Sequence, residues 1–278
     1  VRFGSTISDD KFAKEEFDFM LSNPPFGTPW KTDLKAWGID KKDEISDSRF
    51  IINYDDNPEY SLLPDIGDPQ MLFLANNISK MKTTTDLGSR IIEVHNGSSL
   101  FTGKAGSGPS NLRRYIFEQD LCEAIVAIPE NMFYNTGIGT YLWVLTNKKE
   151  EKRKGKVQLI DATGMKTPLR KNLGDKNCEM TEEIRNQVMA LYLAFDKADP
   201  EYSKVFSNEE FGYYQVEVNR PLRLKVSIDK SALLNFKEIG KDEELYTFLS
   251  SKFPNVDCLN YNEFISKLEK DIKTAGLK

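Results

Sequence analysis

Short apolar runs separated by turn residues dominate the first 160 residues of the chain. The run at 17–22 stops at Asn23-Pro24-Pro25, where proline ends a ladder of hydrogen bonds, so it predicts a buried strand. Similar runs, rich in β-branched and aromatic residues, lie at 89–96, 122–128, 139–146 and 156–161. Helical spacing of apolar residues appears instead at 68–82 and 110–119. This order of strands and helices predicts an α/β layer with a mainly parallel sheet.

Two connections in this part are informative. The runs at 139–146 and 156–161 are joined by a short charged turn, so we expect them to be antiparallel partners at one edge of the sheet. Residues 27–67 hold many Gly, Pro, Asp and Asn residues without sustained periodicity, which predicts a long excursion without regular structure. Loops of that length inside a compact domain are more often functional than not.

The pattern changes near residue 178. Thr181 is a candidate cap for a helix, residues 205–225 contain alternating valines, and amphipathic helices are predicted near 242–252 and 261–274. We therefore expect two parts, an α/β domain at 1–177 and a mainly helical region at 178–278.

Composition narrows the classes of function. The chain has 278 residues and a net charge of −5, which excludes nucleic-acid binding through bulk positive charge but not through a local basic groove. Three widely spaced cysteines and one histidine support neither a disulfide framework nor a metal site. No apolar run approaches eighteen residues, so we expect a cytoplasmic protein that does not enter a membrane. The start at Val1 rather than Met indicates the later part of a longer polypeptide.

The segment Asn23-Pro24-Pro25-Phe26 carries the most specific chemistry. Such a tetrapeptide arises by chance in roughly one chain of this size in a hundred, and it follows a predicted strand at the edge where open α/β sheets bind ligands. The Asn23 amide oxygen and the Pro24 carbonyl are acceptors for the two N–H groups of a planar amine, and the prolines hold them rigidly. Phe26 can stack on a flipped base. A plain Pro-Pro turn with Phe26 in the core remains the alternative.

Other residues are weaker candidates. The glycine cluster at 103–108 lacks the features of a phosphate loop and is interpreted as a flexible loop. The lysines and arginine within 148–156 either contact phosphate or form a solvated turn, and the turn is favoured. Trp30 and Lys31 either line a base pocket or touch phosphate, or lie in an exposed loop. His95 is interpreted as a satisfied side chain at the end of a strand.

These motifs resemble those of the adenine-N6 DNA methyltransferases, specifically the modification subunit of type I restriction–modification systems. The matching stretches are 17–27, 68–74, 96–101, 113–119, 121–140, 155–161 and 206–224, of which 121–140 is the most particular to that subunit.

The resemblance implies a fold and a function. The fold would be the later half of a Rossmann-like methyltransferase sheet, mixed and with an antiparallel edge strand, at 1–177, and then a mainly helical region at 178–278 that docks a subunit. The implied activity is transfer of a methyl group from S-adenosylmethionine to adenine N6 in DNA, with Asn23, Pro24, Pro25 and Phe26 as catalytic residues. The implied partners are a DNA specificity subunit, a second modification subunit, a restriction subunit and double-stranded DNA with a flipped adenine.

One departure and two alternatives accompany the resemblance. The glycine-rich cofactor loop that precedes the Asn-Pro-Pro-Phe motif in this family is absent from the sequence, so Asn23 would meet only the methyl end of the cofactor, and we expect the isolated fragment to be inactive. Loss of the early strands would leave an unpaired sheet edge. An enzyme acting on an RNA base or a protein glutamine, or a non-catalytic docking fragment, remains possible at this stage.

Overall fold

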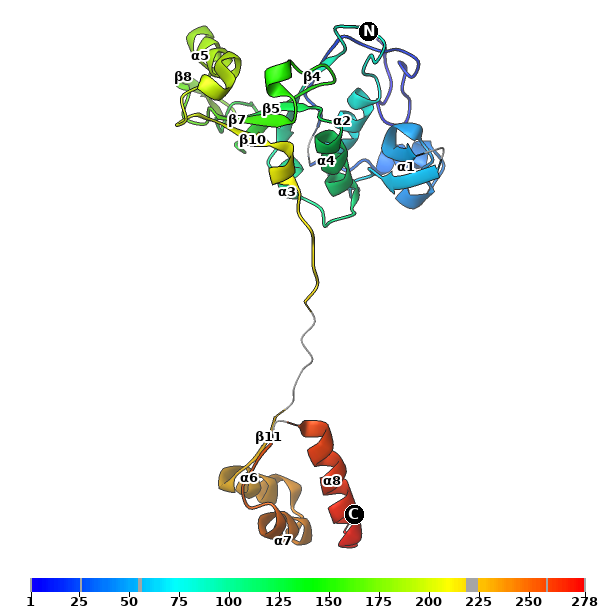
Figure 1. The fold of residues 1–278 in the computed structure, drawn as a ribbon, viewed down its shortest axis with the longest axis vertical. Coiled ribbons are helices and arrows are strands. Elements are labelled where there is room, and N and C mark those ends of the chain that lie inside the picture. The colour runs from blue at the N-terminus through cyan, green and yellow to red at the C-terminus, as the bar shows by residue number, and fades with distance from the viewer. Residues whose placement is uncertain (1, 26, 55–56, 219–224, 259, 278) are drawn as a thin grey trace. The chain divides into compact units, whose positions relative to one another are not determined.

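The computed structural model of the chain describes residues 2–25, 27–54, 57–218, 225–258 and 260–277. The chain forms two compact units, Val1–Gln215 and Val216–Lys278. The first unit contains the central sheet and the Asn-Pro-Pro segment (Figure 1). Within the described ranges no helix is both long and apolar enough to cross a membrane.

A six-stranded mixed sheet lies at the centre of the first unit. Its strands are β1 (Phe19–Ser22), β4 (Arg90–Asn96), β6 (Thr140–Thr146), β5 (Cys122–Ile128), β7 (Lys156–Asp161) and β10 (Ser203–Ser207), in this spatial order. β1, β4, β5 and β7 run in one direction, and β6 and β10 run in the other. The predicted α/β fold with a mixed sheet and an antiparallel edge strand is confirmed, and the antiparallel strand at the edge is β10.

The predicted pairing of β6 with β7 is wrong. β5 lies between them, antiparallel to β6 and parallel to β7. Almost every residue of β5 is buried, as expected for a strand covered on both faces. The charged connection at 147–155 only has to cross two strand spacings, about 10 Å, which nine residues span easily.

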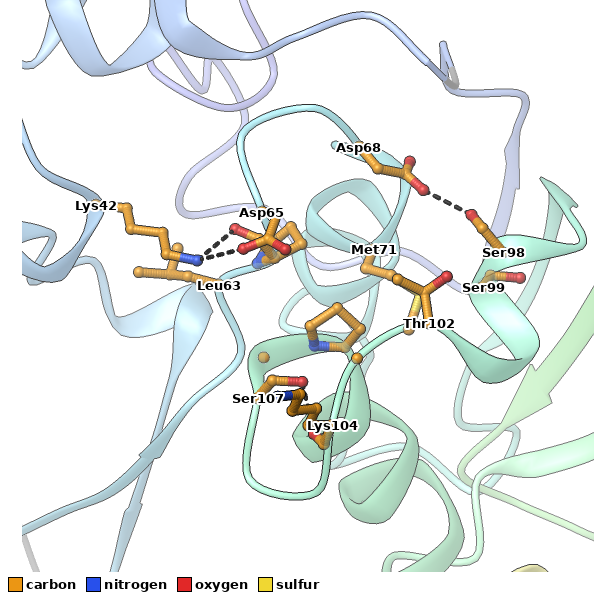
Figure 2. Close-up of a pocket in the computed structure, with 14 residues that line it drawn as sticks. Lys42, Leu63, Asp65, Asp68, Met71, Ser98, Ser99, Thr102, Lys104 and Ser107 are labelled. Atoms are coloured by element: carbon orange, nitrogen blue, oxygen red, sulfur yellow. Dashed lines mark hydrogen bonds and ion pairs between the residues drawn. The ribbon is translucent and has the colours of Figure 1, made fainter. Parts of the chain in front are cut away.

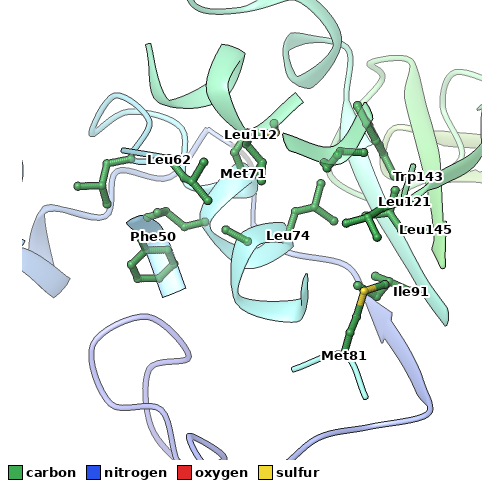
Figure 3. Close-up of a cluster of buried hydrophobic side chains, with 14 of the residues drawn as sticks. Phe50, Leu62, Met71, Leu74, Met81, Ile91, Leu112, Leu121, Trp143 and Leu145 are labelled. Carbon is green, nitrogen blue, oxygen red and sulfur yellow. The ribbon is translucent and has the colours of Figure 1, made fainter. Parts of the chain in front are cut away.

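Helices cover the two faces of the sheet differently. α2 (Gln70–Ile78) and α4 (Gly108–Glu118) pack over the main hydrophobic core (Figure 3), to which Leu72, Leu74 and Ile91 contribute fully buried side chains. α5 (Glu182–Ala194) contacts β7 and covers a second, smaller cluster that contains Val126 and Ile128. Since side chains alternate along a strand, Val126 and Ile128 face away from Ile125, which belongs to the main core.

The segment at 27–67 is more ordered than its composition predicts. It contains α1 (Lys31–Ala36), two 3-10 turns (Lys42–Glu44 and Ser48–Phe50) and a hairpin of β2 (Ile51–Tyr54) and β3 (Asn57–Ser61). Phe50, Leu34 and Leu62 from this segment are buried in the main core. The expectation of an irregular excursion therefore fails, because isolated apolar residues without periodicity still anchor it to α2 and α4.

Several short elements complete the first unit. They are α3 (Ser98–Phe101), the hairpin of β8 (Thr167–Leu173) and β9 (Lys176–Glu179), and 3-10 turns at Glu151–Arg153, Phe195–Lys197 and Asn208–Phe211.

Among its described residues, the second unit contains a two-stranded antiparallel sheet and three helices. The sheet pairs β11 (Val226–Ile228) with β12 (Val256–Cys258), and the helices are α6 (Lys230–Gly240), α7 (Glu243–Lys252) and α8 (Tyr261–Thr274). The helices at 242–252 and 261–274 were expected, whereas α6 was not. The division into units also differs from the predicted boundary at 177/178, because β10 returns to pair with β7 and retains residues up to 215 in the first unit.

β1 forms the other edge of the sheet. Its one neighbour among the described strands is β4, and Phe19 and Leu21, on one face of β1, are 67% and 83% exposed. Met20, on the opposite face, is buried in the main core. An apolar strand edge of this kind favours association with another chain segment.

Candidate active site

Asn23-Pro24-Pro25 leaves the sheet at the carboxyl end of β1. Asn23 and Pro25 are exposed, and Pro24 is buried. Ser22 pairs with Glu93 in parallel register, so the segment continues beside His95 and Asn96 at the end of β4. Phe26, the fourth predicted catalytic residue, lies outside the described residues. The segment thus lies at the carboxyl ends of the parallel strands, where α/β folds bind their ligands.

Trp30 anchors the chain just after this segment. Its side chain is only 2% exposed and belongs to the main core. The indole Nε1 donates a hydrogen bond to the carbonyl oxygen of Asp65 at 3.1 Å, and the Trp30 N–H donates to the Ile66 carbonyl at 3.0 Å. The predicted location in an exposed loop is therefore wrong for Trp30, while its neighbour Lys31 is exposed at the start of α1.

A buried amide ties the start of α2 to the end of β4. Gln70 is fully buried, and its Nε2 lies 2.7 Å from Asp68 Oδ2, 2.7 Å from Asn96 Oδ1 and 2.6 Å from Ser98 Oγ. The backbone N–H of Asn96 donates to Gln70 Oε1 at 3.0 Å. This polar cluster sets the path of the chain after β4, next to the Asn-Pro-Pro segment. The role of Gln70 was not predicted, although a polar residue among the apolar positions of α2 was a signal.

His95 lies near the carboxyl end of β4, inside the protein. It is fully buried, and its Nε2 is 2.7 Å from Glu93 Oε1, whose second oxygen accepts a hydrogen bond from Asn77 Nδ2 at 2.6 Å. The His95 Nδ1 has no hydrogen-bond partner among the described residues. The expectation of a fully satisfied strand-end histidine is therefore met at one nitrogen only.

A cavity of about 450 Å³ lies beyond the polar cluster (Figure 2). Its lining comes from the 3-10 turn Lys42–Glu44, the loop before α2, α3 and the turn before α4, and includes Lys42, Asp65, Asp68, Ser98 and Ser107. Lys42 Nζ lies 2.9 Å from Asp65 Oδ1, and Ser98 Oγ lies 2.6 Å from Asp68 Oδ2. The cavity lining does not include Asn23–Pro25, so we do not place the acceptor site in it.

The glycine cluster at 103–108 forms a defined turn at one wall of this cavity. Gly103 and Gly106 have positive φ angles, and a Cβ on Gly108 would lie 2.0 Å from the carbonyl oxygen of Leu63. Close packing of Gly108 against the neighbouring loop therefore explains this glycine better than a flexible loop does.

The basic cluster at 148–156 is partly structural. Lys149 is buried and its Nζ lies 2.6 Å from Asp120 Oδ1. Arg153 is also buried, between the rings of Tyr192 and Phe195, with its Nε 3.6 Å from Glu123 Oε1. The favoured interpretation as a solvated turn is therefore wrong for these two cations, because both are buried in ion pairs within the fold.

The loop at 129–138 follows β5 at the same edge of the sheet. β9 and the turn before it hold this loop, because Asn177 N–H donates to the Asn131 carbonyl at 3.2 Å and Asp175 N–H donates to the Tyr134 carbonyl at 3.0 Å. Tyr134 is 65% exposed. Asn23 and Tyr134 are therefore both exposed at the carboxyl ends of their strands, and these strands stand three places apart in the sheet.

Comparison with known proteins identifies relatives of this chain. A family model described as N-6 DNA methylase matches residues 1–227. The chain is 26% identical over 201 residues to the type I restriction enzyme MjaIX methylase subunit of Methanocaldococcus jannaschii, which covers 72% of this chain and 32% of the relative. It is 30% identical over 149 residues to the type I restriction enzyme HindI methylase subunit of Haemophilus influenzae, covering 53% of this chain and 28% of the relative.

The fold has a counterpart among solved structures. The methyltransferase subunit of a type I restriction–modification system from Streptococcus thermophilus matches with a TM-score of 0.56 and 19% identity, over 74% of this chain and 38% of that one. The chain spans about a third of the length of the curated relatives it matches. Because the family model covers most of the chain, from the Asn-Pro-Pro segment to beyond β10, the chain belongs to the N-6 DNA methylase family.

Proposed function

We propose that the complete protein transfers a methyl group from S-adenosylmethionine to N6 of adenine in DNA, as the modification subunit of a type I restriction–modification complex. The observation that carries the proposal is the exposed Asn23 directly after β1, followed by buried Pro24, in a chain whose family is the N-6 DNA methylases. The names of the relatives add the type I setting.

The proposed chemistry uses this chain to activate the acceptor amine. The lone pair of an adenine amino group is delocalised into the ring, so the nitrogen is a weak nucleophile. The Asn23 Oδ1 and the Pro24 carbonyl oxygen accept hydrogen bonds from the two N–H groups of this amine. These hydrogen bonds draw the nitrogen towards a tetrahedral, more reactive form. Asn23 is neutral, so it acts by hydrogen bonding and positioning and not as a general base. Phe26 stacks on the flipped base.

The described residues fit the acceptor end of this reaction but not the far ends of the cofactor. Binding of a nucleotide cofactor in a doubly wound sheet requires a glycine-rich turn after one strand and an acidic residue after the next. Here β1 is followed by Asn23-Pro24-Pro25 and β4 by Asn96-Gly97-Ser98, neither of which is such a turn. In this chain, Asn23 therefore meets the methyl end of the donor, and the grip on its adenosine and carboxylate ends is assigned to other parts of the complete protein.

The proposed partners follow from the same setting. The acidic net charge of −5 suits a catalytic subunit whose target sequence is recognised by a separate specificity subunit. A second modification subunit and a restriction subunit would complete the complex, in the cytoplasm. The second unit of the chain, with its three amphipathic helices, is the proposed docking region.

Replacement of Asn23 tests the site. In the complete protein, Asn23→Ala should lower the rate of methyl incorporation into DNA by about a hundredfold or more, because one preorganised acceptor is lost. Asn186→Ala, at an exposed position of α5, is the matched control and should keep the wild-type rate. Phe26→Ala should also slow the reaction, since stacking on a base is worth about 1–3 kcal/mol, whereas Phe26→Tyr should be tolerated. An Asn23→Ala protein with the wild-type rate would refute the assignment, and methylation of RNA or protein but not DNA would refute the substrate.

A further inference from the structure

The hairpin of β8 and β9 is largely exposed. We call residues 166–179 the β8–β9 ribbon. In β8 every side chain except that of Leu169 is exposed, and β8 lies beside α5 on the side of the unit away from α1 (Figure 1). A two-stranded hairpin is marginally stable alone. An outer strand with so little burial therefore contributes little to folding, which leaves its side chains to be explained by an external contact.

The ribbon is basic within an acidic chain. Lys166, Arg170, Lys171 and Lys176 stand against Asp175 and Glu179, so it carries a formal charge of +2 where the whole chain has −5. Among the described residues, no acidic side chain forms an ion pair with Lys166, Arg170 or Lys171. By contrast, the turn between β6 and β7 lies at the opposite ends of the strands, and its Lys152 and Lys154 are paired with Glu150 and Glu151.

The pairing of β8 with β9 is interrupted where two of these cations lie. Pro168 pairs with Cys178 and Leu173 pairs with Lys176, so residues 169–172 stand opposite Asn177 alone. This large bulge contains Arg170 and Lys171. Bulges bend a strand and re-aim its side chains, and they often occur next to active sites.

The ribbon is also held at the edge that carries the proposed active site. Its turn lies against Tyr134, where a Cβ on Gly174 would be 2.3 Å from the Tyr134 carbonyl oxygen, and Lys176 Nζ donates to the Met132 carbonyl at 3.2 Å. Tyr134 follows β5, which stands three strands from β1 in the sheet. That separation is about 14 Å at the usual strand spacing, the length of about four base pairs of duplex.

We propose that the β8–β9 ribbon binds the phosphate backbone of the DNA duplex next to the flipped adenine, through Lys166, Arg170 and Lys171. The inference rests on the proposed function, because it takes DNA as the substrate. Within the part of the chain that the structure describes, these three cations are exposed and have no ion-pair partner. The ribbon that carries them is held against the loop after β5, a strand that lies three strand spacings from β1. Phosphate contacts of this kind fix the register of a protein on a duplex without reading sequence. A two-stranded ribbon also has the dimensions of the major groove.

A triple substitution tests the proposal in the complete protein with its partner subunits. The variant Lys166→Gln, Arg170→Gln, Lys171→Gln should bind a duplex with its target site more weakly, by about tenfold or more at 0.1 M salt. The slope of log Kd against log salt concentration should fall by about 2–3, because three phosphate contacts are lost. Target and non-target duplexes should be affected equally, since the contacts carry no sequence information.

The matched control removes the same number of charges elsewhere. The control variant changes three exposed cations at and just before the start of β7, by Lys152→Gln, Lys154→Gln and Lys156→Gln together. It should keep the wild-type salt slope. Equal slopes for the ribbon variant and the control would overturn the inference. So would a ribbon variant that keeps the wild-type slope but no longer assembles with its partner subunits in sedimentation, which would identify a protein interface. In either case DNA methylation by the wild-type protein would still support the proposed function, whereas its absence would refute that function independently.

Discussion

The indole nitrogen of Trp30 donates a hydrogen bond to the backbone carbonyl oxygen of Asp65, 35 residues further along the chain, at 3.1 Å. This contact fixes the far end of the loop that begins at Asn23, while β1 fixes its near end. The proposed acceptor groups are thus held between two anchors, and their geometry depends on a residue that lies in the core.

Removal of the indole donor should therefore affect both stability and catalysis. Trp30→Phe keeps an aromatic ring but leaves the Asp65 carbonyl without this partner, at a cost of about 1–2 kcal/mol in the free energy of unfolding. We expect kcat for methylation to fall several-fold with a smaller change in KM for DNA, because the loop is less well positioned.

Trp37→Phe is the control for this prediction. Trp37 lies directly after α1 and packs only partly buried against the same core. Trp37→Phe should change both kcat and the free energy of unfolding less than Trp30→Phe does. Urea denaturation and steady-state kinetics of both variants make the comparison, and equal effects at the two positions would contradict the anchoring role.

Isolated, the 278-residue chain should not bind S-adenosylmethionine with useful affinity. Asn23 can meet the reactive methyl group, but the turns after β1 and β4 lack the groups that hold the other ends of the cofactor. Calorimetric titration should show no saturation up to about 1 mM cofactor, which corresponds to binding weaker than about −4 kcal/mol. Tight stoichiometric binding by this chain would place the cofactor site within these residues.

The pair of Asp120 and Lys149 should make stability depend on pH in the acid range. Burial raises the pKa of Asp120, but hydrogen bonds from Lys149, the Gly155 N–H and Asn208 outweigh it and hold the pKa of this carboxyl below its ordinary value of 3.8. A folded-state pKa below the unfolded one stabilises the fold above about pH 4, and this contribution is lost as the pH falls through the folded-state value.

Asp120→Asn tests that sign. It should lower the free energy of unfolding by about 1–2 kcal/mol at pH 7, and the difference from wild type should shrink at pH 3. Glu150→Gln, which breaks an exposed ion pair with Lys152, should leave the unfolding curve nearly unchanged at both pH values. A deficit of Asp120→Asn that stays constant from pH 7 to pH 3 would contradict the linkage.

The Cys122 thiol should be inert in the folded protein. Burial raises the pKa of Cys122 to about 12, so at pH 8 roughly one molecule in ten thousand carries the reactive thiolate. Iodoacetamide at pH 8 should leave Cys122 unmodified in native buffer and label it fully in urea, as mass spectrometry of its peptide would show. Rapid labelling of the native protein would mean that this end of β5 opens to solvent.

The local sequence pattern determined most of the helices and strands. The strands at 89–96, 122–128, 139–146 and 156–161 are confirmed to within a residue, because each is a short apolar run bounded by turn residues. Asn23-Pro24-Pro25 was also evident from sequence, since two prolines end a strand in a way that few other residues can. The helix α6 was missed, although its apolar residues have a helical spacing at least as clear as that of α7, which was predicted.

Only the tertiary structure decided which strands are neighbours and which polar residues meet. The insertion of β5 between β6 and β7 depends on burial of β5 on both faces, a property of the whole sheet and not of the turn between β6 and β7. In the same way, Gln70 meets Asn96 across 26 residues, and Trp30 meets Asp65 across 35. Such contacts leave no periodic signal in a sequence, because their free energy is gained only when the sheet brings distant segments together.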